Sequence, residues 1–427
     1  GGGAATPAAA HLALAQPQLA PAGPPADDWT TFAHDQMRTG FQAQPTGITV
    51  ANVGQLAPRW VLHTGEPTSA SPLVSGGRVY TASQSGTVRA LDVLSGTLIW
   101  QTNVGGSIVM TPTLADGKLF VGTHDSPATF AALDAATGAV QWRVSRPGVF
   151  RSEPAVEGGL VVEGLAGGDP PDCVQGGVFA FDENTGAVRW SWQTSPNAND
   201  GGAVWSPISF DGNALYFGTG NTCTKPTANA NAIVSVDLAG SLRWAVTGAA
   251  SISDDDFGGG VLLDDDDAFA TGKNAQVYEL NAATGSVDWQ APLGAVDGYG
   301  GIGTPTTDGT MLIASTGDLA DPTVNPVPGG KLLAYDDLGN VRWSVASLVP
   351  VAGYAALAGG IAFADLDNAV VALDVNTGAK LWSAAGPSPF YASPAIVPSG
   401  LYVVDTAGNV TAYGLTGQSQ SLRRTVK

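Results

Sequence analysis

Apolar and polar residues alternate along the chain in a unit that recurs seven times. In the first unit, residues 86–91 alternate as a β-strand does, and Asp92, Gly96 and Trp100 follow. An aspartate at a strand end accepts hydrogen bonds from the turn backbone, and glycine supplies the positive φ that a tight turn needs. The unit therefore predicts a β-hairpin whose second strand carries a tryptophan, and we expect the ring to fill the gap between neighbouring sheets. The glycine–tryptophan pairs are Gly96 and Trp100, Gly138 and Trp142, Gly186 and Trp190, Gly240 and Trp244, Gly285 and Trp289, Gly339 and Trp343, and Gly378 and Trp382.

Two further strands are expected upstream of each hairpin. In the first unit these are Arg78–Thr81 and a strand that opens at Ser71 and Pro72, a Ser/Thr-Pro start that several other units share. Four strands in this order form an antiparallel sheet. From Trp60 to Trp382 the intervals between the tryptophans of the pattern run from 39 to 54 residues, which suits the blade of a β-propeller.

The two ends of the repeat region predict how the ring closes. Trp60 has no strands before it, whereas residues 383–415 hold three strand patterns and no tryptophan. Pairing the strand at Trp60 with these three completes an eighth blade and removes the free sheet edges. The sequence thus predicts an all-β, eight-bladed propeller over residues 29–427, with N- and C-terminal strands in one blade. Residues 1–28 are predicted to form a separate arm, rich in alanine and proline.

Composition narrows the class of protein. The chain has 57 Gly and 28 Pro in 427 residues, and only 13% of its residues are charged, about half the usual ~25%. Both features argue against a helical fold, because Gly and Pro destabilise helix interiors. The net charge of −19 would repel a phosphate backbone, so nucleic-acid binding is not expected.

The chain ends and the cysteines bear on location. The sequence starts Gly-Gly-Gly rather than with Met, which indicates an N-terminus that is either processed or trimmed. We expect an exported protein in the periplasm, at the cell surface or outside the cell. The arm is either a tether to a surface anchor or a segment that packs on a neighbouring subunit. Cys173 and Cys223 are the only cysteines; they form one disulfide or remain two buried thiols.

The repeated pattern Ala-Leu-Asp-x-x-Thr-Gly-x-x-x-Trp is similar to the repeat of the quinoprotein, or PQQ-type, β-propellers. The resemblance covers residues from about 29 to 415. It implies the same eight-bladed fold. It leaves the function open, because the family includes dehydrogenases, outer-membrane assembly scaffolds and uncharacterised surface proteins.

The same resemblance assigns candidate site residues. In the dehydrogenases of this family a tryptophan lies beneath the quinone, a basic residue contacts its oxygens, and carboxylate and amide groups hold calcium. The resemblance gives these roles to Trp205, to Lys273, and to Asn221, Asp256 and Asp172, with Asp256 also as the catalytic carboxylate. Ca²⁺ prefers such oxygen ligands, and a carboxylate can take the alcohol proton. The alternative is that Trp205 and Asn221 serve blade packing and turns, and that Asp256 belongs to a solvated loop.

Departures from the dehydrogenases lead to two hypotheses. The sequence lacks adjacent cysteines and a Cys-x-x-Cys-His haem motif, and it has few long insertions. The first hypothesis is a non-catalytic, exported binding or assembly scaffold without a cofactor, which forms a homo-oligomer or filament through its arm. Its low charge suits close subunit packing. The alternative is a PQQ- and calcium-dependent alcohol dehydrogenase. A carbohydrate- or peptide-binding propeller is the remaining possibility.

Overall fold

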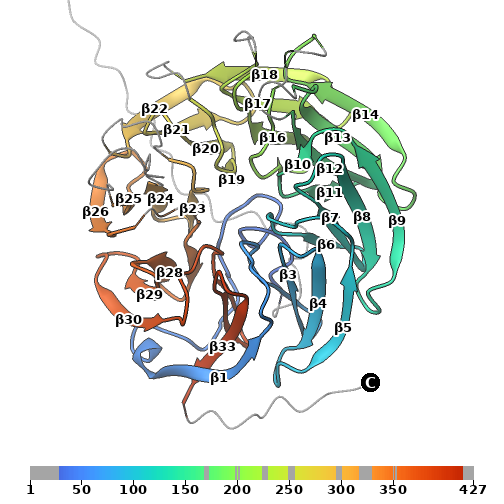
Figure 1. The fold of residues 1–427 in the computed structure, drawn as a ribbon. Helices are drawn as coiled ribbons and strands as arrows, with labels where there is room; N and C mark the ends of the chain where they lie inside the picture. The colour runs from blue at the N-terminus through green and yellow to red at the C-terminus, as the bar shows by residue number, and fades with distance from the viewer. Residues whose placement is uncertain are drawn as a thin grey trace, which may run out of the picture.

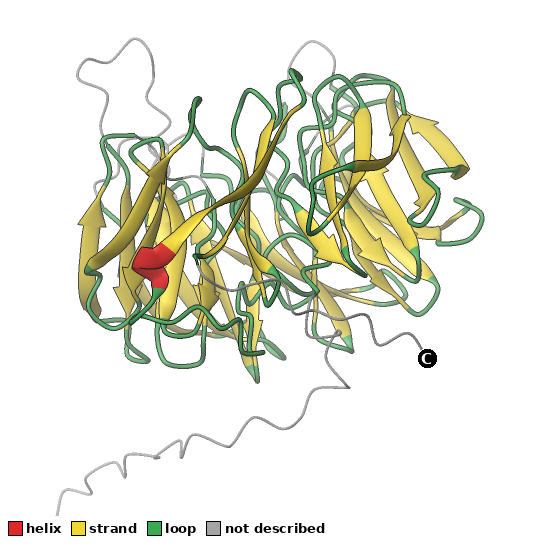
Figure 2. Ribbon diagram, turned by 90° about the horizontal axis from the view of Figure 1, so that it is seen from below, coloured by secondary structure: helices red, strands yellow, loops and turns green. Residues whose placement is uncertain are grey.

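Eight β-sheets surround a central axis (Figure 1). The computed structural model describes residues 28–167, 173–197, 200, 202–223, 229–248, 255–294, 301–316, 329–349, 351 and 353–416. In this part of the chain the regular elements are β-strands and one short 3-10 helix, η1 (Val53–Gln55). Seen from the side, loops join the strands at both faces of the ring (Figure 2). The predicted all-β, eight-bladed propeller is confirmed, whereas residues 1–27 of the predicted arm lie outside the described residues.

The strands lie side by side in chain order in blades one, two and four to seven, whereas in blade three β10 and β11 both pair with β12. Blade one contains β2 (Leu73–Ser75), β3 (Arg78–Ala82), β4 (Thr87–Asp92) and β5 (Leu98–Asn103). Blade two contains β6 (Thr113–Ala115), β7 (Lys118–Gly122), β8 (Ala128–Asp134) and β9 (Val140–Arg146). Blade three contains β10 (Val149–Phe150), β11 (Ala155–Glu157), β12 (Leu160–Ala166), β13 (Gly177–Asp182) and β14 (Val188–Gln193). Blade four contains β15 (Ser209–Phe210), β16 (Ala214–Gly218), β17 (Ala232–Asp237) and β18 (Leu242–Thr247).

The second half of the ring repeats this arrangement. Blade five contains β19 (Leu262–Asp264), β20 (Asp267–Gly272), β21 (Gln276–Asn281) and β22 (Val287–Pro292). Blade six contains β23 (Thr306–Thr307), β24 (Leu312–Thr316), β25 (Lys331–Tyr335) and β26 (Val341–Ala346). Blade seven contains β27 (Ala356–Ala358), β28 (Ile361–Leu366), β29 (Ala369–Asp374) and β30 (Lys380–Ala385). Blade eight contains β31 (Ala395–Val397), β32 (Gly400–Val404), β33 (Asn409–Leu415) and β1 (Leu56–His63).

Blade eight closes the ring as the sequence predicted. Strand β1 pairs with β33 in antiparallel register, and Trp60 lies opposite Ala412 (Figure 1). The first and last strands of the ring therefore share one sheet.

The repeated turns explain why each unit folds locally. Asp92 ends β4, and its Oδ1 accepts the backbone N–H groups of Leu94 and Ser95 at 3.1 and 2.9 Å. Gly96 then takes a φ of +68° and donates its N–H to the Asp92 carbonyl at 2.8 Å. This short network needs only neighbouring residues, which is why the sequence pattern predicts it.

The tryptophans link one blade to the next. The indole Nε1 of six of them donates to the carbonyl of the residue that follows the turn Asp or Asn of the next blade. The pairs are Trp60 and Val93 (3.1 Å), Trp100 and Ala135 (3.1 Å), Trp142 and Glu183 (2.8 Å), Trp190 and Leu238 (2.8 Å), Trp244 and Ala282 (3.0 Å), and Trp343 and Val375 (2.8 Å). The tryptophans thus supply both apolar burial and a directional bond between blades.

The N-terminal segment, residues 29–42, closes one end of the channel. It runs past the innermost strands and forms backbone hydrogen bonds with six blades. It contacts blade three through a side chain, because Gln36 Oε1 accepts the backbone N–H of Val156 at 3.4 Å. The six donor–acceptor pairs are Trp29 N and Val74 O (2.6 Å), Leu114 N and Thr30 O (2.8 Å), Phe210 N and Gln36 O (2.8 Å), Leu263 N and Met37 O (2.8 Å), Thr307 N and Thr39 O (3.0 Å), and Leu357 N and Gly40 O (2.7 Å). Figure 1 shows this blue segment crossing the centre of the ring.

Arg38 anchors this segment. Its side chain is fully buried, and its guanidinium donates to the carbonyls of Phe32 (2.9 Å), Glu153 (3.2 Å), Pro154 (3.2 Å) and Ile208 (2.5 Å). It also donates to the Thr31 hydroxyl. Burial lowers the pKa of Arg38 to about 10, so the group stays cationic at neutral pH. One buried charge thus joins the segment to blades three and four.

Three carboxyl groups meet in blade five. One carboxylate oxygen from each of Asp267, Glu279 and Asp288 lies within 4.8 Å of the others. Glu279 lies two residues before the turn residue Asn281. In the other six repeat units this position carries Ala or Ser, such as Ala90 and Ser235. Burial, and then repulsion by Asp267, raises the pKa of Glu279 from its ordinary value of 4.5 to about 7.

We expect Glu279→Gln to stabilise the protein above pH 7. The folded state holds a proton on Glu279 that the unfolded chain releases near pH 4.5, so stability falls as the pH rises from about 4.5 to 7. Because Glu279 is only half-buried, we expect a gain of about 1 kcal/mol at pH 8 and little change at pH 4. Urea unfolding at both pH values measures it. The exposed Glu157→Gln variant controls for net charge; an equal gain there would contradict the local explanation.

No helix among the described residues is long and apolar enough to cross a lipid bilayer.

Candidate ligand site in the central channel

A cavity of about 950 Å³ occupies the central channel. Its walls include Trp205, Asn221, Asp256 and Lys273, so these four predicted site residues converge on one cavity. Phe32 of the N-terminal segment also lines the cavity, which indicates that the segment closes its inner end. The volume falls within the ~300–1,000 Å³ range of typical small-molecule sites.

Loops of blades four and five carry the four residues. Trp205 lies between β14 and β15, and Asn221 follows β16. Asp256 precedes β19, and Lys273 lies in the turn between β20 and β21. Since the blades converge on the channel at their inner strands, loops that are distant in sequence meet there.

Asp256 is the centre of the polar contacts. Its Oδ2 accepts Trp205 Nε1 at 3.2 Å and Lys273 Nζ at 3.1 Å, while its Oδ1 accepts the Asn221 backbone N–H at 2.8 Å. The side chains of Asp256 and Lys273 are 9% and 11% exposed, so this ion pair is largely shielded from water. The predicted alternative of a solvated loop does not fit Asp256, which is buried and fully engaged.

The ring of Trp205 has cations near it. Arg151 Cζ and Lys273 Nζ each lie 5.3 Å from the ring centroid. A side chain at Gly258 would overlap the ring, because a Cβ built there lies 1.8 Å from one ring carbon. The site therefore combines a flat aromatic surface with positive charge, which favours planar ligands that carry negative charge.

The arrangement does not fit a calcium ion among the described residues. Lys273 already balances the charge of Asp256, and the Asn221 amide oxygen accepts Asn231 Nδ2 at 2.9 Å. Calcium needs six to eight oxygen ligands with free lone pairs. Asp172, the further predicted ligand, lies outside the described residues.

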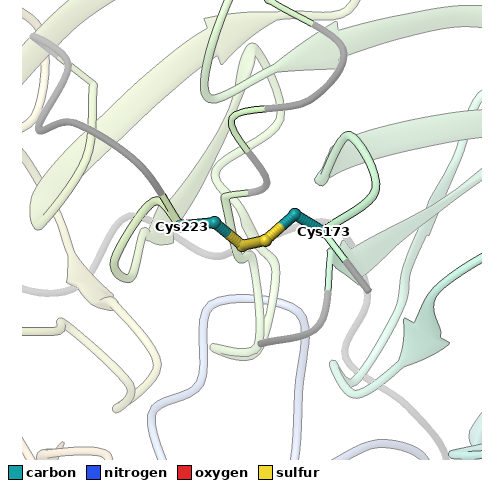
Figure 3. Close-up of a disulfide and its surroundings, with 2 residues drawn as sticks. All are labelled: Cys173 and Cys223. Atoms are coloured by element: carbon teal, nitrogen blue, oxygen red, sulfur yellow. A yellow bond between two sulfur atoms is a disulfide. The ribbon is translucent and has the colours of Figure 1, made fainter. Parts of the chain in front are cut away.

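Cys173 and Cys223 form the predicted disulfide (Figure 3). The two residues are separated by 50 positions in the sequence, and the bond joins the loop between β12 and β13 to the loop between β16 and β17. Asn221 lies two residues before Cys223, so the bridge restrains the loop that carries this site residue. The alternative of two free thiols is excluded.

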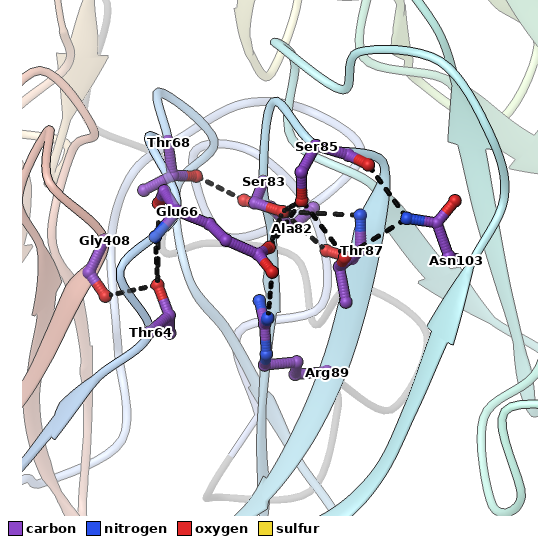
Figure 4. Close-up of polar contacts among 10 residues, drawn as sticks. All are labelled: Thr64, Glu66, Thr68, Ala82, Ser83, Ser85, Thr87, Arg89, Asn103 and Gly408. Atoms are coloured by element: carbon purple, nitrogen blue, oxygen red, sulfur yellow. Dashed lines mark hydrogen bonds and ion pairs between the residues drawn. The ribbon is translucent and has the colours of Figure 1, made fainter.

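A polar network holds another wall of the cavity. The loop between β1 and β2 brings Thr68 and Ser69 to the cavity. In this loop, Glu66 pairs with Arg89 at 2.8 Å and accepts the hydroxyl of Ser83 at 2.6 Å (Figure 4). The Arg89 side chain holds the pKa of Glu66 down to about 2.

Sequence reasoning missed three further wall residues. His124, Arg151 and Glu153 line the cavity beside the predicted four. Burial, and then the charge of Arg151, lowers the pKa of His124. The sequence did contain a signal for Glu153. The strand starts of several other units read Ser-Pro or Thr-Pro, whereas this one reads Glu-Pro. No pattern in the sequence pointed to Arg151.

Comparisons with known proteins agree with the architecture. The family model described as outer membrane protein assembly factor BamB matches residues 43–233, 229–326 and 320–422. The polyvinylalcohol dehydrogenase of Sphingopyxis sp. is 24% identical over 291 residues, which are 57% of this chain and 43% of the relative. The quinohemoprotein alcohol dehydrogenase of Comamonas testosteroni is 28% identical over 241 residues, or 45% of this chain and 33% of the relative. The chain thus spans less than half the length of these curated relatives.

Solved structures show the same fold. The crystal structure of quinohemoprotein alcohol dehydrogenase from Comamonas testosteroni aligns with a TM-score of 0.77 at 20% identity, covering 93% of this chain and 82% of that chain. BamB from Moraxella catarrhalis aligns with a TM-score of 0.65 at 19% identity, covering 84% of this chain and 99% of that chain. Together with the disulfide, the family indicates a location outside the cytoplasm. The chain belongs to the family of PQQ-like β-propellers that is described as outer membrane protein assembly factor BamB.

Proposed function

We propose that this propeller binds a planar, anionic quinone of the PQQ class, stacked on Trp205 in the central cavity. The observation that carries the proposal is the convergence of Trp205, Asn221, Asp256 and Lys273 on one cavity. Arg151, whose Cζ lies 5.3 Å from the ring centroid, favours the carboxylates of such a ligand, while Asp256 balances the charge of Lys273. Several dehydrogenases with related sequences are named for quinone or quinohemoprotein chemistry.

Lys273 takes the position of a bound cation in this proposal. Its ammonium neutralises Asp256 where the resemblance to the dehydrogenases placed calcium. A bound quinone would supply two-electron oxidation of an alcohol, while the protein would hold the quinone between the aromatic ring and the cations. We therefore expect ligand binding that does not require calcium.

The test is a titration of the purified protein with PQQ in EDTA, followed by tryptophan fluorescence and by equilibrium dialysis. We expect saturable binding in EDTA that changes little when Ca²⁺ is added. Trp205→Leu should weaken binding about tenfold, because the stacking surface is lost. Trp382→Leu, on the outermost strand of blade seven, is the matched control and should bind as the unaltered protein does.

Lys273→Met separates the role of the charge from that of the ring. We expect weaker binding in EDTA, and recovery with Ca²⁺, because Asp256 is then available to a metal. Absence of saturable PQQ binding with and without Ca²⁺ would contradict the proposed function.

A binding scaffold is the second candidate function. The alignment with BamB spans 99% of that chain, whereas the dehydrogenase relatives extend well beyond this one. The sequence predicts that such a scaffold assembles with itself through residues 1–28, as a homo-oligomer or filament at the cell surface. Sedimentation and electron microscopy of the protein with and without residues 1–28 test it; a monomer in both cases at high concentration would exclude assembly through the arm.

A further inference from the structure

Two buried glutamates of blade three, Glu153 and Glu163, are not among the four residues of the proposed ligand site. Glu153, just before β11, is 4% exposed and lines the cavity, while Glu163 on β12 is 0% exposed. Ser152, next to Glu153 in the chain, is 3% exposed. Its N–H donates to Glu163 Oε1 at 3.3 Å, so the serine and the deeper carboxylate are in direct contact.

Glu153 takes a position beside the channel that carries Ser or Thr in several other blades. In other blades, a backbone N–H at the start of the inner strand donates to the hydroxyl of the corresponding residue in the next blade. The pairs are Ser71 N and Thr111 Oγ1 (2.9 Å), Gly260 N and Thr304 Oγ1 (2.7 Å), and Tyr354 N and Ser393 Oγ (2.9 Å). At blade three the Thr111 N–H instead meets Glu153 Oε1 at 3.4 Å. A carboxylate therefore stands where a neutral hydroxyl is sufficient for the fold.

Two buried oxygen atoms beside this carboxylate have no partner among the described residues. They are Glu163 Oε2 and Ser152 Oγ. Buried polar atoms in native proteins are normally met by protein groups, water or an ion, because an unmet one costs about 1–3 kcal/mol. The free oxygens of the serine and of the deeper glutamate thus indicate that something else contacts them.

The local charges do not balance. Arg38 is the cation that acts on both glutamates, but its donors go to carbonyls and to the Thr31 hydroxyl rather than to either carboxylate. When both glutamates are ionised, they and Arg38 together carry a net charge of −1, and Asp35 also acts on Arg38. Burial raises the pKa of Glu153 to about 7, and burial together with repulsion by Glu153 raises the pKa of Glu163 well above its usual range.

We propose that Glu153, Glu163 and Ser152 bind a small monovalent cation, Na⁺, that enters from the cavity. The donors are all hard oxygen atoms, and one added positive charge neutralises the ionised pair Glu153 and Glu163 together with Arg38. A divalent ion would leave excess positive charge beside the buried Arg38, and Mg²⁺ would also demand near-ideal octahedral geometry. The site uses none of the four residues of the proposed ligand site, so the two proposals stand or fall separately.

The first test is thermal unfolding of the full chain at pH 8 in EDTA, in NaCl or in choline chloride of equal ionic strength. We expect NaCl to raise Tm by about 3 °C relative to choline chloride as the concentration increases to 0.5 M, because an ion that binds only the folded state stabilises it. At pH 4 protons occupy both carboxyl groups, so the difference between the salts should vanish. Equal Tm values in both salts at pH 8 would overturn the proposal. They would mean that a proton or a water molecule, rather than Na⁺, contacts Glu153 and Glu163.

Matched variants show which carboxyl group is responsible. Glu163→Gln should abolish the response to Na⁺. Asp365→Asn is the control, since Asp365 is another carboxyl group with a partnerless buried oxygen and a pKa raised well above the usual range, on β28 of blade seven. This control should keep the full response, and its loss there would overturn the assignment to blade three.

A direct measurement covers the case in which Glu163→Gln fails to fold. Sodium-23 NMR of the unaltered protein should show line broadening that excess Li⁺ reverses and choline does not. Broadening that is absent at pH 8, or unchanged at pH 4, would overturn the proposal. PQQ titration of the same sample reports on the ligand site independently.

Discussion

Replacement of Arg38 by methionine is expected to lower the free energy of unfolding by about 3–5 kcal/mol. The buried guanidinium donates to the carbonyls of Phe32, Glu153, Pro154 and Ile208, and methionine would leave all four unmet. It would also remove the positive charge that acts on the buried carboxyl group of Glu163. Urea unfolding followed by tryptophan fluorescence measures the change.

Arg342→Met is the matched control for this variant. Arg342 Nη1 lies 3.6 Å from Asp336 Oδ2, and the arginine side chain is 55% exposed. Exposed pairs of this kind contribute about 0–1 kcal/mol, so the control should unfold nearly as the unaltered protein does. A loss below about 1 kcal/mol in Arg38→Met would show that the N-terminal segment is held by its backbone hydrogen bonds alone.

Gly186→Ala is expected to cost about 3 kcal/mol, through two separate effects. Gly186 has a φ of +71°, where a Cβ is strained by about 1–2 kcal/mol. A Cβ there would also lie 2.7 Å from the ring of Trp142, whose Nε1 donates to the Glu183 carbonyl at 2.8 Å. The ring would have to shift and lose packing between blades two and three. The loss is read from the same urea unfolding curves.

Gly158→Ala isolates the backbone effect. Gly158 has a φ of +58°, but nothing lies within 4 Å of a Cβ built there. We expect it to cost only about 1–2 kcal/mol, so the difference between the two variants reports the contact with the tryptophan. Equal losses would mean that the interface between blades adapts to the extra methyl group.

Much of the fold could be predicted because its signals are local. Asp92 and Gly96 build their turn from residues that are adjacent in the chain, and the pattern recurs in seven units. The closure of blade eight followed from counting strands, since Trp60 needed partners and residues 383–415 lacked a fourth strand. The path of residues 29–42 around the channel could not be predicted, because it depends on backbone bonds to six blades rather than on side-chain pattern.

The candidate site was only partly predictable. The resemblance to quinoproteins identified Trp205, Asn221, Asp256 and Lys273, and all four reach the cavity. It did not predict that Lys273 pairs with Asp256 in place of a metal, since that depends on how two loops of blade five face each other. The sequence also did not predict the contact of Arg151 with Trp205, because the two residues belong to different blades, three and four.

The sequence alone therefore determined the repeat, the number of blades and the closure of the ring, because turn chemistry and strand alternation act over a few residues. The tertiary structure decided what the channel contains. It set Lys273 against Asp256, turned Arg151 toward Trp205 and buried Glu153 with Glu163 near Arg38. These contacts depend on the distances between loops and strands of different blades and on the burial of charged groups. Neither can be predicted from the residues along one strand.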